Sequence, residues 1–253
     1  MIETELARRL SVVLVGTRNP GNIGSAARAM VNMGLCRLKL VRPVAEWGEE
    51  ARMMASGALD RMDPIQVHTS FDESVAGVQV LVGTTSGRER RTHQPVYTPR
   101  RIAPLLKRHA RTQEVALLFG PENRGLTDLQ LSRCRYLVTV PSNDAFPVLN
   151  LAQAVMVLAY EINTCGEADR DVQPDLVTHG QRERMFRHME RVLIRIGFLS
   201  SSNPDHVMKA IRRFLGRADL SERDVRILRG IFSQVEWYER QGDRLPADQV
   251  RKP

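Results

Sequence analysis

The 253-residue sequence contains few cysteines and lacks a long apolar run. Its three cysteines, Cys36, Cys134 and Cys165, lie far apart, form no CxxC pair and have no histidine at ligand spacing, which argues against a disulfide framework and a zinc site. The longest apolar run, residues 148–159, contains an asparagine and a glutamine and is too short to cross a bilayer. We therefore expect no membrane span, signal peptide or metal, and a reducing cytoplasm as the compartment.

Acidic residues are outnumbered by basic ones, which gives a net charge of +8 and a pI of about 10.0. This balance favours a polyanionic or acidic partner. Within residues 88–111 a single acid, Glu89, accompanies eight basic residues, namely Arg88, Arg90, Arg91, Arg100, Arg101, Lys107, Arg108 and Arg111. Because arginine forks bind phosphate bidentately, this segment is a candidate phosphate-binding surface, with a solvated basic face as the alternative.

The first two thirds of the chain alternate between short apolar runs and helical patterns. This alternation predicts an α/β fold, with a mainly parallel sheet covered by helices on both faces. The expected strands lie at residues 11–15, 38–41, 65–68, 78–82, 115–119 and 136–140, and the expected helices at 25–33, 49–56 and 149–165. Four of these strands end in polar, glycine-containing loops, which is where open α/β sheets bind ligands.

Composition divides the chain into parts. Residues 1–165 are expected to form the α/β domain, and residues 166–180 are acidic and poor in apolar side chains, as in an exposed linker. In residues 181–240 apolar positions recur at intervals of three and four, which predicts a small all-helical extension of three helices. The last residues, 241–253, are expected to be a disordered tail.

The loop after the first strand contains glycines but matches neither familiar phosphate-binding pattern. Gly16 and Gly21 have P-loop spacing, yet the lysine and hydroxyl residue that a P-loop needs are missing, and no GxGxxG is present. What remains is a turn followed by a helix N-terminus able to hold an anion, with Arg28 about one turn into the helix. The alternative for Arg28 is a surface salt bridge.

Three ordered segments carry a family resemblance. They are NPGNIGSAARAM at residues 19–30, LFGPENRGL at 118–126, and VTVP at 138–141 followed by LNLAQA at 149–154. These segments resemble the motifs of the SpoU-type ribose methyltransferases of the SPOUT superfamily, and the resemblance covers residues 11–163. The helical segments 207–215 and 225–231 are also similar to the extension of the branch of tRNA 2′-O-methyltransferases that acts on position 32, at the edge of the anticodon loop.

The resemblance implies a trefoil knot over residues 115–160, which is an exception to the rule against knots. In the family this knot forms the S-adenosylmethionine pocket and much of a homodimer interface. The implied cofactor contacts are Thr84, Thr85, Ser86, Gly120, Val140, Val148, Leu149 and Asn150, with Glu122 beside them. Val148 stands where family members commonly have serine. Because valine has no hydroxyl group, it cannot take over any catalytic role that the serine hydroxyl has in the family.

The resemblance also implies the reacting groups. Arg28 matches the arginine implicated in activating the 2′-hydroxyl, although an arginine stays protonated in proteins and is a poor base. We therefore expect Arg28 to stabilise negative charge on O2′ or to hold the adjacent phosphate. Asn22 is the expected second polar contact, and Glu122 is expected to orient Arg28 or RNA from the partner subunit.

The expected RNA contacts are Arg88 and Arg90, with Arg91 in reserve, on the anticodon-stem backbone. Arg212 and Arg213, with Arg226 and Arg229, would extend that surface, unless they form salt bridges within a helical bundle. Three alternatives stay open: ribose methylation of ribosomal RNA or of another tRNA position, a catalytically silent RNA-binding module, and an interaction protein that works through residues 181–240.

Overall fold

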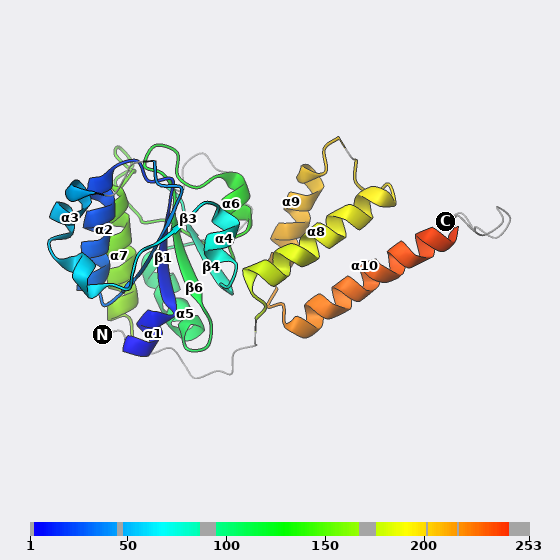
Figure 1. The fold of residues 1–253 in the computed structure, drawn as a ribbon, viewed down its shortest axis with the longest axis horizontal. Coiled ribbons are helices and arrows are strands. Elements are labelled where there is room, and N and C mark those ends of the chain that lie inside the picture. Colours follow the sequence, from blue (N-terminus) through cyan, green and yellow to red (C-terminus); the bar gives the residue numbers. More distant parts are fainter. Residues whose placement is uncertain are drawn as a thin grey trace. The chain divides into compact units, whose positions relative to one another are not determined.

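The computed structural model describes residues 3–44, 48–86, 95–166, 176–200, 202–216 and 218–242. The chain divides into two compact units, Met1–Gln173 and Pro174–Pro253 (Figure 1). Most of the expected linker, residues 167–175, and the expected tail from residue 243 onward lie outside the described residues.

A seven-stranded sheet forms the centre of the first unit, in the order β3-β2-β1-β6-β4-β7-β5. Every neighbouring pair is parallel, which confirms the predicted fold class. The central strands β1 and β6 are fully buried and apolar, as strands covered on both faces must be. The strands are β1 Leu10–Val15, β2 Arg37–Val41, β3 Gln66–His68, β4 Val80–Thr84, β5 Val96–Tyr97, β6 Val115–Phe119 and β7 Tyr136–Val138.

Helices cover both faces of this sheet. In Figure 1, α2, α3 and α7 lie on one side of the sheet, and α4 and α6 lie on the other. The helices are α1 Thr4–Arg8, α2 Pro20–Asn32, α3 Glu49–Ala55, α4 Phe71–Val75, α5 Pro99–Ala110, α6 Asp128–Ser132 and α7 Leu151–Thr164, with a 3₁₀ turn at Ala58–Arg61. On the α4 and α6 side, Phe71, Val75 and Leu131 pack on the sheet residues Val13 and Leu118.

Helix α2 begins at Pro20, which is earlier than the predicted start at residue 25. The Asn19 side chain accepts a hydrogen bond from Gly21 N at 2.7 Å, and Pro20 supplies the fixed backbone angle that suits a first helical position. A Cβ on Gly24 would lie 2.0 Å from the Ala51 carbonyl oxygen, so this glycine permits α2 to pack closely on α3. As a consequence, Arg28 lies about two turns from the helix N-terminus rather than one.

Helix α5 contains much of the segment that was interpreted as a phosphate-binding surface. The Lys107 side chain is buried, and its Nζ donates to the Cys165 carbonyl oxygen at 2.7 Å. Arg100 forms an ion pair with Glu161 at 3.7 Å. For Lys107 the phosphate-binding interpretation is wrong, because the buried side chain holds α5 against the end of α7. The Arg100 side chain is 86% exposed despite its ion pair, so for this residue the interpretation stays a prediction.

The described residues of the second unit form the helices α8 His179–Arg195, α9 Asp205–Gly216 and α10 Glu222–Gly242, and this confirms the all-helical extension. Its core contains Met185, Phe186 and Met189 of α8, with Met208 of α9 and Val225 of α10. Leu176 is buried and pairs with Ser221 in an antiparallel bridge. Residues 176–180 therefore belong to this unit, and the predicted linker 166–180 is too long at its end.

Among the described residues, none of the helices combines the length and apolar character that crossing a bilayer requires. In the same part of the chain, no three His, Cys, Asp or Glu side chains gather as metal ligands. The three cysteines all lie among the described residues and form no disulfide.

Candidate active site

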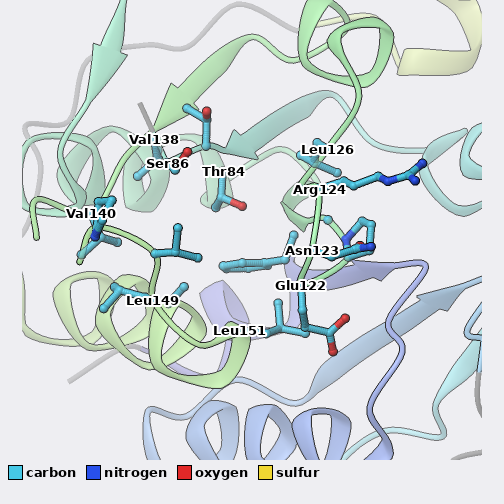
Figure 2. A pocket seen from close by; sticks show the side chains of 18 of the residues that line it. Thr84, Ser86, Glu122, Asn123, Arg124, Leu126, Val138, Val140, Leu149 and Leu151 are labelled. Atoms are coloured by element: carbon cyan, nitrogen blue, oxygen red, sulfur yellow. The ribbon is translucent and has the colours of Figure 1, made fainter. Parts of the chain in front are cut away.

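A pocket of about 230 Å³ lies where β4, β6 and β7 end and α7 begins. Figure 2 shows Thr84 and Ser86 on one wall and Leu149 and Leu151 on the facing wall, while the Arg124 side chain extends away from the pocket. Seven of the eight cofactor contacts expected from the sequence line the pocket: Thr84, Thr85, Ser86, Gly120, Val140, Val148 and Leu149. The structure therefore brings together residues from three segments, at positions 84–86, 120 and 140–149 of the chain.

Hydrogen bonds between neighbouring strands fix the end of β4. The Thr84 hydroxyl donates to the Leu118 carbonyl oxygen at 2.9 Å, and Thr85 N donates to the Val138 carbonyl oxygen at 2.9 Å. Sequence reasoning missed most of the apolar lining, which comprises Phe119, Pro121, Leu126, Val138, Pro147, Leu151, Ala154 and Leu158. Six of these eight residues, Leu126 and Leu151 among them, lie inside the quoted motifs, and this membership is the signal that could have identified them.

Gly120 is required by the loop itself. A Cβ at this position would lie 2.1 Å from the carbonyl carbon of Gly125 and 2.2 Å from the nitrogen of Leu126. Neither contact could be relieved by rotation of a side chain, because both atoms belong to the backbone. The backbone that approaches Gly120 closely is the returning loop at residues 125–126, which forms one wall of the pocket.

Glu122, Asn22 and Asn150 form a hydrogen-bonded cluster at the rim of the pocket. Asn22 Nδ2 donates to Glu122 Oε1 at 2.8 Å, and Asn150 Nδ2 donates to Asn22 Oδ1 at 2.8 Å. Asn150 is also the N-cap of α7, where its Oδ1 accepts from Ala152 N at 2.8 Å. The cluster therefore links the start of α2, the loop after β6 and the start of α7.

The Glu122 carboxylate also accepts two backbone hydrogen bonds, from Arg18 N at 3.1 Å and from Asn19 N at 3.3 Å. Partial burial alone would raise the pKa of this carboxyl. The hydrogen bonds from Asn22 and from the backbone more than offset that effect, so the pKa of Glu122 lies below its ordinary value. The carboxylate is consequently ionised at neutral pH and holds the loop after β1 in place.

This lowered pKa predicts a pH dependence that Glu122→Gln should remove. Because the pKa is lower in the folded state, ionised Glu122 adds to the free energy of unfolding above the ordinary glutamate pKa of about 4.3. That contribution is lost as the pH falls from there through the folded-state pKa. Melting temperatures measured from pH 7 to pH 3 should show the variant below the wild type at pH 7, with a gap that closes as the pH falls. A gap of constant size would contradict this assignment.

Arg28 lies outside this cluster. Its side chain is exposed, does not line the pocket, and makes no hydrogen bond or ion pair with the part of the chain that the structure describes. Glu122 contacts Asn22 and backbone atoms instead, so the expectation that it orients Arg28 does not hold within one chain. Arg28 also has no acidic partner among the described residues, so they give no support to the alternative that it forms a surface salt bridge.

The expected RNA contacts have different outcomes. Arg88, Arg90 and Arg91 lie outside the described residues. Arg212 is wrong as an RNA contact because it is buried: its Nη1 lies 2.5 Å from Glu183 Oε1, and its guanidinium lies 4.6 Å from the centre of the Phe186 ring. Arg213 is half-buried on α9.

Two family comparisons cover both units. Residues 9–160 match the SpoU rRNA Methylase family, and residues 180–246 match the C-terminal domain of the tRNA methyltransferase TrmJ. The chain is 41% identical over 242 residues to the tRNA (cytidine/uridine/adenosine-2′-O-)-methyltransferase TrmJ of Pseudomonas aeruginosa, covering 90% of this chain and 94% of that protein. It is 35% identical over 257 residues to the tRNA (cytidine/uridine-2′-O-)-methyltransferase TrmJ of Yersinia pestis, covering 98% and 99%.

Solved structures give the same result. The crystal structure of TrmJ from Z. mobilis matches with a TM-score of 0.79 and 34% identity, covering 89% of this chain and 98% of that one. A putative methylase family protein from Neisseria gonorrhoeae matches with a TM-score of 0.67 and 34% identity, covering 75% and 97%. The chain therefore belongs to the SpoU methylase family and, within it, to the TrmJ proteins.

Proposed function

We propose that this chain is an S-adenosylmethionine-dependent tRNA methyltransferase that methylates the ribose 2′-hydroxyl of the cytidine or uridine at position 32 of the anticodon loop. The observation that carries the proposal is the pocket at the ends of β4, β6 and β7, which is lined by the residues that the family motifs supply. Support for tRNA as the substrate comes from the TrmJ relatives, whose similarity extends over both units of the chain.

The residues of the pocket fit the proposed cofactor. Apolar side chains such as Leu126, Val138 and Leu149 suit an adenine ring, while the Ser86 hydroxyl and the backbone of the strand-end loops offer polar contacts. Thr84 already donates to a backbone carbonyl, so its role is to position the end of β4. When bound, the cofactor supplies a methyl group attached to a positively charged sulfur.

Arg28 is the proposed catalytic residue. Its guanidinium remains protonated, so it donates hydrogen bonds to the negative charge that develops on O2′, or to the adjacent phosphate, and the hydroxyl proton leaves to another acceptor. Asn22 and Glu122 are positioning residues in this scheme. Their side chains bind each other and the loop after β1, which shapes the rim where the ribose would lie.

A second copy of the chain is proposed to complete the site. Arg28 does not line the pocket of its own chain, and it is exposed and unpaired among the described residues. Helix α7 leaves Tyr160 51% exposed beside half-buried Met156, which suits an interface. A homodimer through α2 and α7 would present Arg28 to the partner's pocket. The trefoil knot over residues 115–160 and the cytoplasmic location stay predictions.

Two alternatives have a specific observation behind them. The first unit matches a family named for methylation of ribosomal RNA, and this match supports rRNA as a second candidate substrate class. Val148, which is 57% exposed at the pocket, supplies no hydroxyl where family members commonly have serine, and this favours a silent RNA-binding module.

The test is to incubate the purified protein with S-adenosylmethionine labelled in its methyl group and with either unmodified bulk tRNA or unmodified ribosomal RNA. We expect label on tRNA, recovered after alkaline hydrolysis in dinucleotides, because a 2′-O-methyl group blocks cleavage of the following phosphodiester. Label on rRNA alone would favour the second substrate class. Cofactor binding without label on either RNA would favour the silent module and contradict the proposal.

A further inference from the structure

We propose that a groove between α8 and α10 binds a phosphodiester of the tRNA backbone, and this inference rests on the proposed function. The groove is a pocket of about 370 Å³ within the helical unit. Helix α8 contributes Gln181 and Arg184, which lie three positions apart, and α10 contributes Arg226 and Arg229, also three apart. Because positions three apart share one face of a helix, these four side chains line facing walls.

The three arginines of the groove are not paired with any acid among the described residues. Arg184, Arg226 and Arg229 are exposed, and none of them makes a hydrogen bond or ion pair with the described residues. The acidic side chain in the lining is Glu222, which accepts a hydrogen bond from Gln181 Nε2 at 2.8 Å. The groove lining therefore carries three positive charges and one negative charge, a net positive charge.

Other arginines of the same unit are paired with acids. Arg195 lies 2.8 Å from Glu239 between α8 and α10, and Arg212 lies 2.5 Å from Glu183 between α9 and α8. These two arginines, which join helices, thus have carboxylate partners, whereas the three in the groove have none among the described residues. What sets these three apart from other unpaired arginines of the unit is that they line one groove, where a single ligand could contact all of them.

Gly230 leaves the groove open. It lies inside α10, where glycine weakens a helix relative to alanine, and a Cβ added at this position would meet no atom within 4 Å. No packing contact therefore explains the absence of a side chain. The empty space beside Gly230 is part of the groove and gives a ligand access to the arginines on either side.

A phosphodiester suits this arrangement because guanidinium groups bind its oxygens with two parallel hydrogen bonds. Contacts of this kind orient a protein on a nucleic acid without reading its sequence. They also release bound cations, so the binding constant falls steeply with salt. The salt dependence of binding is therefore the quantity that reports on this site.

The test measures the Kd of the full-length protein for an unmodified tRNA transcript across a range of salt concentrations. Arg184→Ala, Arg226→Ala and Arg229→Ala should each weaken binding roughly fivefold. Each should also lower the slope of log K against log salt by about one. Gly230→Asp, which adds a negative charge and removes no arginine, should weaken binding as well, while Gly230→Ala should not.

Arg187→Ala and Arg223→Ala are the matched controls. Both residues are exposed arginines on the same two helices, and neither lines the groove. If the groove variants change the slope no more than these controls do, the inference fails, and methylation of tRNA by the wild type would leave the proposed function standing. If the wild type neither binds nor methylates tRNA, both fail. Saturable binding of inorganic phosphate that the groove variants lose, with unchanged tRNA affinity, would show a small-anion site and overturn the RNA assignment.

Discussion

Replacement of Arg28 by alanine is expected to lower kcat for methyl transfer to tRNA by about 10²- to 10³-fold and to change the Kd for tRNA little. The reason is that Arg28 acts on charge that develops only during the reaction. The affinity of the protein for unreacted tRNA depends on other residues. Arg28 is exposed and unpaired among the described residues, so its removal breaks no internal contact. Single-turnover rates and Kd values for the same transcript separate the two effects.

Two further variants sharpen this prediction. Arg28→Lys keeps the charge and loses the planar fork, so its rate should lie between those of the wild type and the alanine variant. Arg52→Ala removes the same charge from an exposed position on α3 and should leave kcat unchanged. Full activity of Arg28→Lys would show that a fork-shaped donor is not needed. Equal losses in kcat and in tRNA affinity for Arg28→Ala would contradict its assignment as the catalytic residue.

Replacement of Arg212 by alanine is expected to destabilise the helical unit by about 3–5 kcal/mol, because it leaves the Glu183 carboxylate buried without its partner. The side chains of Arg212 and Glu183 are only 9% and 11% exposed. The substitution also removes the contact with the Phe186 ring. Native-state hydrogen exchange, followed separately in peptides from α8 and α9 and in peptides from the sheet, would locate the loss in this unit.

Matched variants distinguish a structural role of Arg212 from an RNA contact. The double replacement Arg212→Met with Glu183→Leu removes both charges and should recover most of the stability, because no buried charge remains unpaired. Arg213→Ala, at the half-buried neighbouring position, should change stability by no more than about 0.5 kcal/mol. Unchanged exchange in Arg212→Ala together with weaker tRNA binding would contradict the structural role.

Hydrophobic pattern predicted six of the seven strands of the sheet, but it missed β5 at Val96–Tyr97 and placed helix boundaries less well. The run at residues 115–119 coincides with β6 because it is apolar throughout and ends at Gly120. The start of α2 was placed at residue 25 because two glycines, Gly21 and Gly24, precede it. The tertiary contact with Ala51 that favours Gly24 over a larger residue is not visible in the sequence. Helix α5 was missed because its basic residues were interpreted as a surface.

The position of the site could be predicted from the strand-end loops, but its internal bonding could not. Asn22 and Glu122 are 100 positions apart, and no local pattern indicates that their side chains meet. Arg212 was interpreted as an RNA contact for the same reason, because its acidic partner Glu183 is 29 positions away on another helix. Pairings across such separations depend on how helices and strands pack, and periodicity reports only which face of each element is apolar.

The most direct test of the proposed reaction uses two transcripts of the same tRNA that differ in one atom. One transcript carries ribose at position 32, and the other carries deoxyribose there and ribose at every other position. If the protein methylates O2′ of that nucleotide, the first transcript accepts one labelled methyl group from S-adenosylmethionine and the second accepts none. Equal labelling of the two transcripts would place the reaction at another atom and contradict the proposed function.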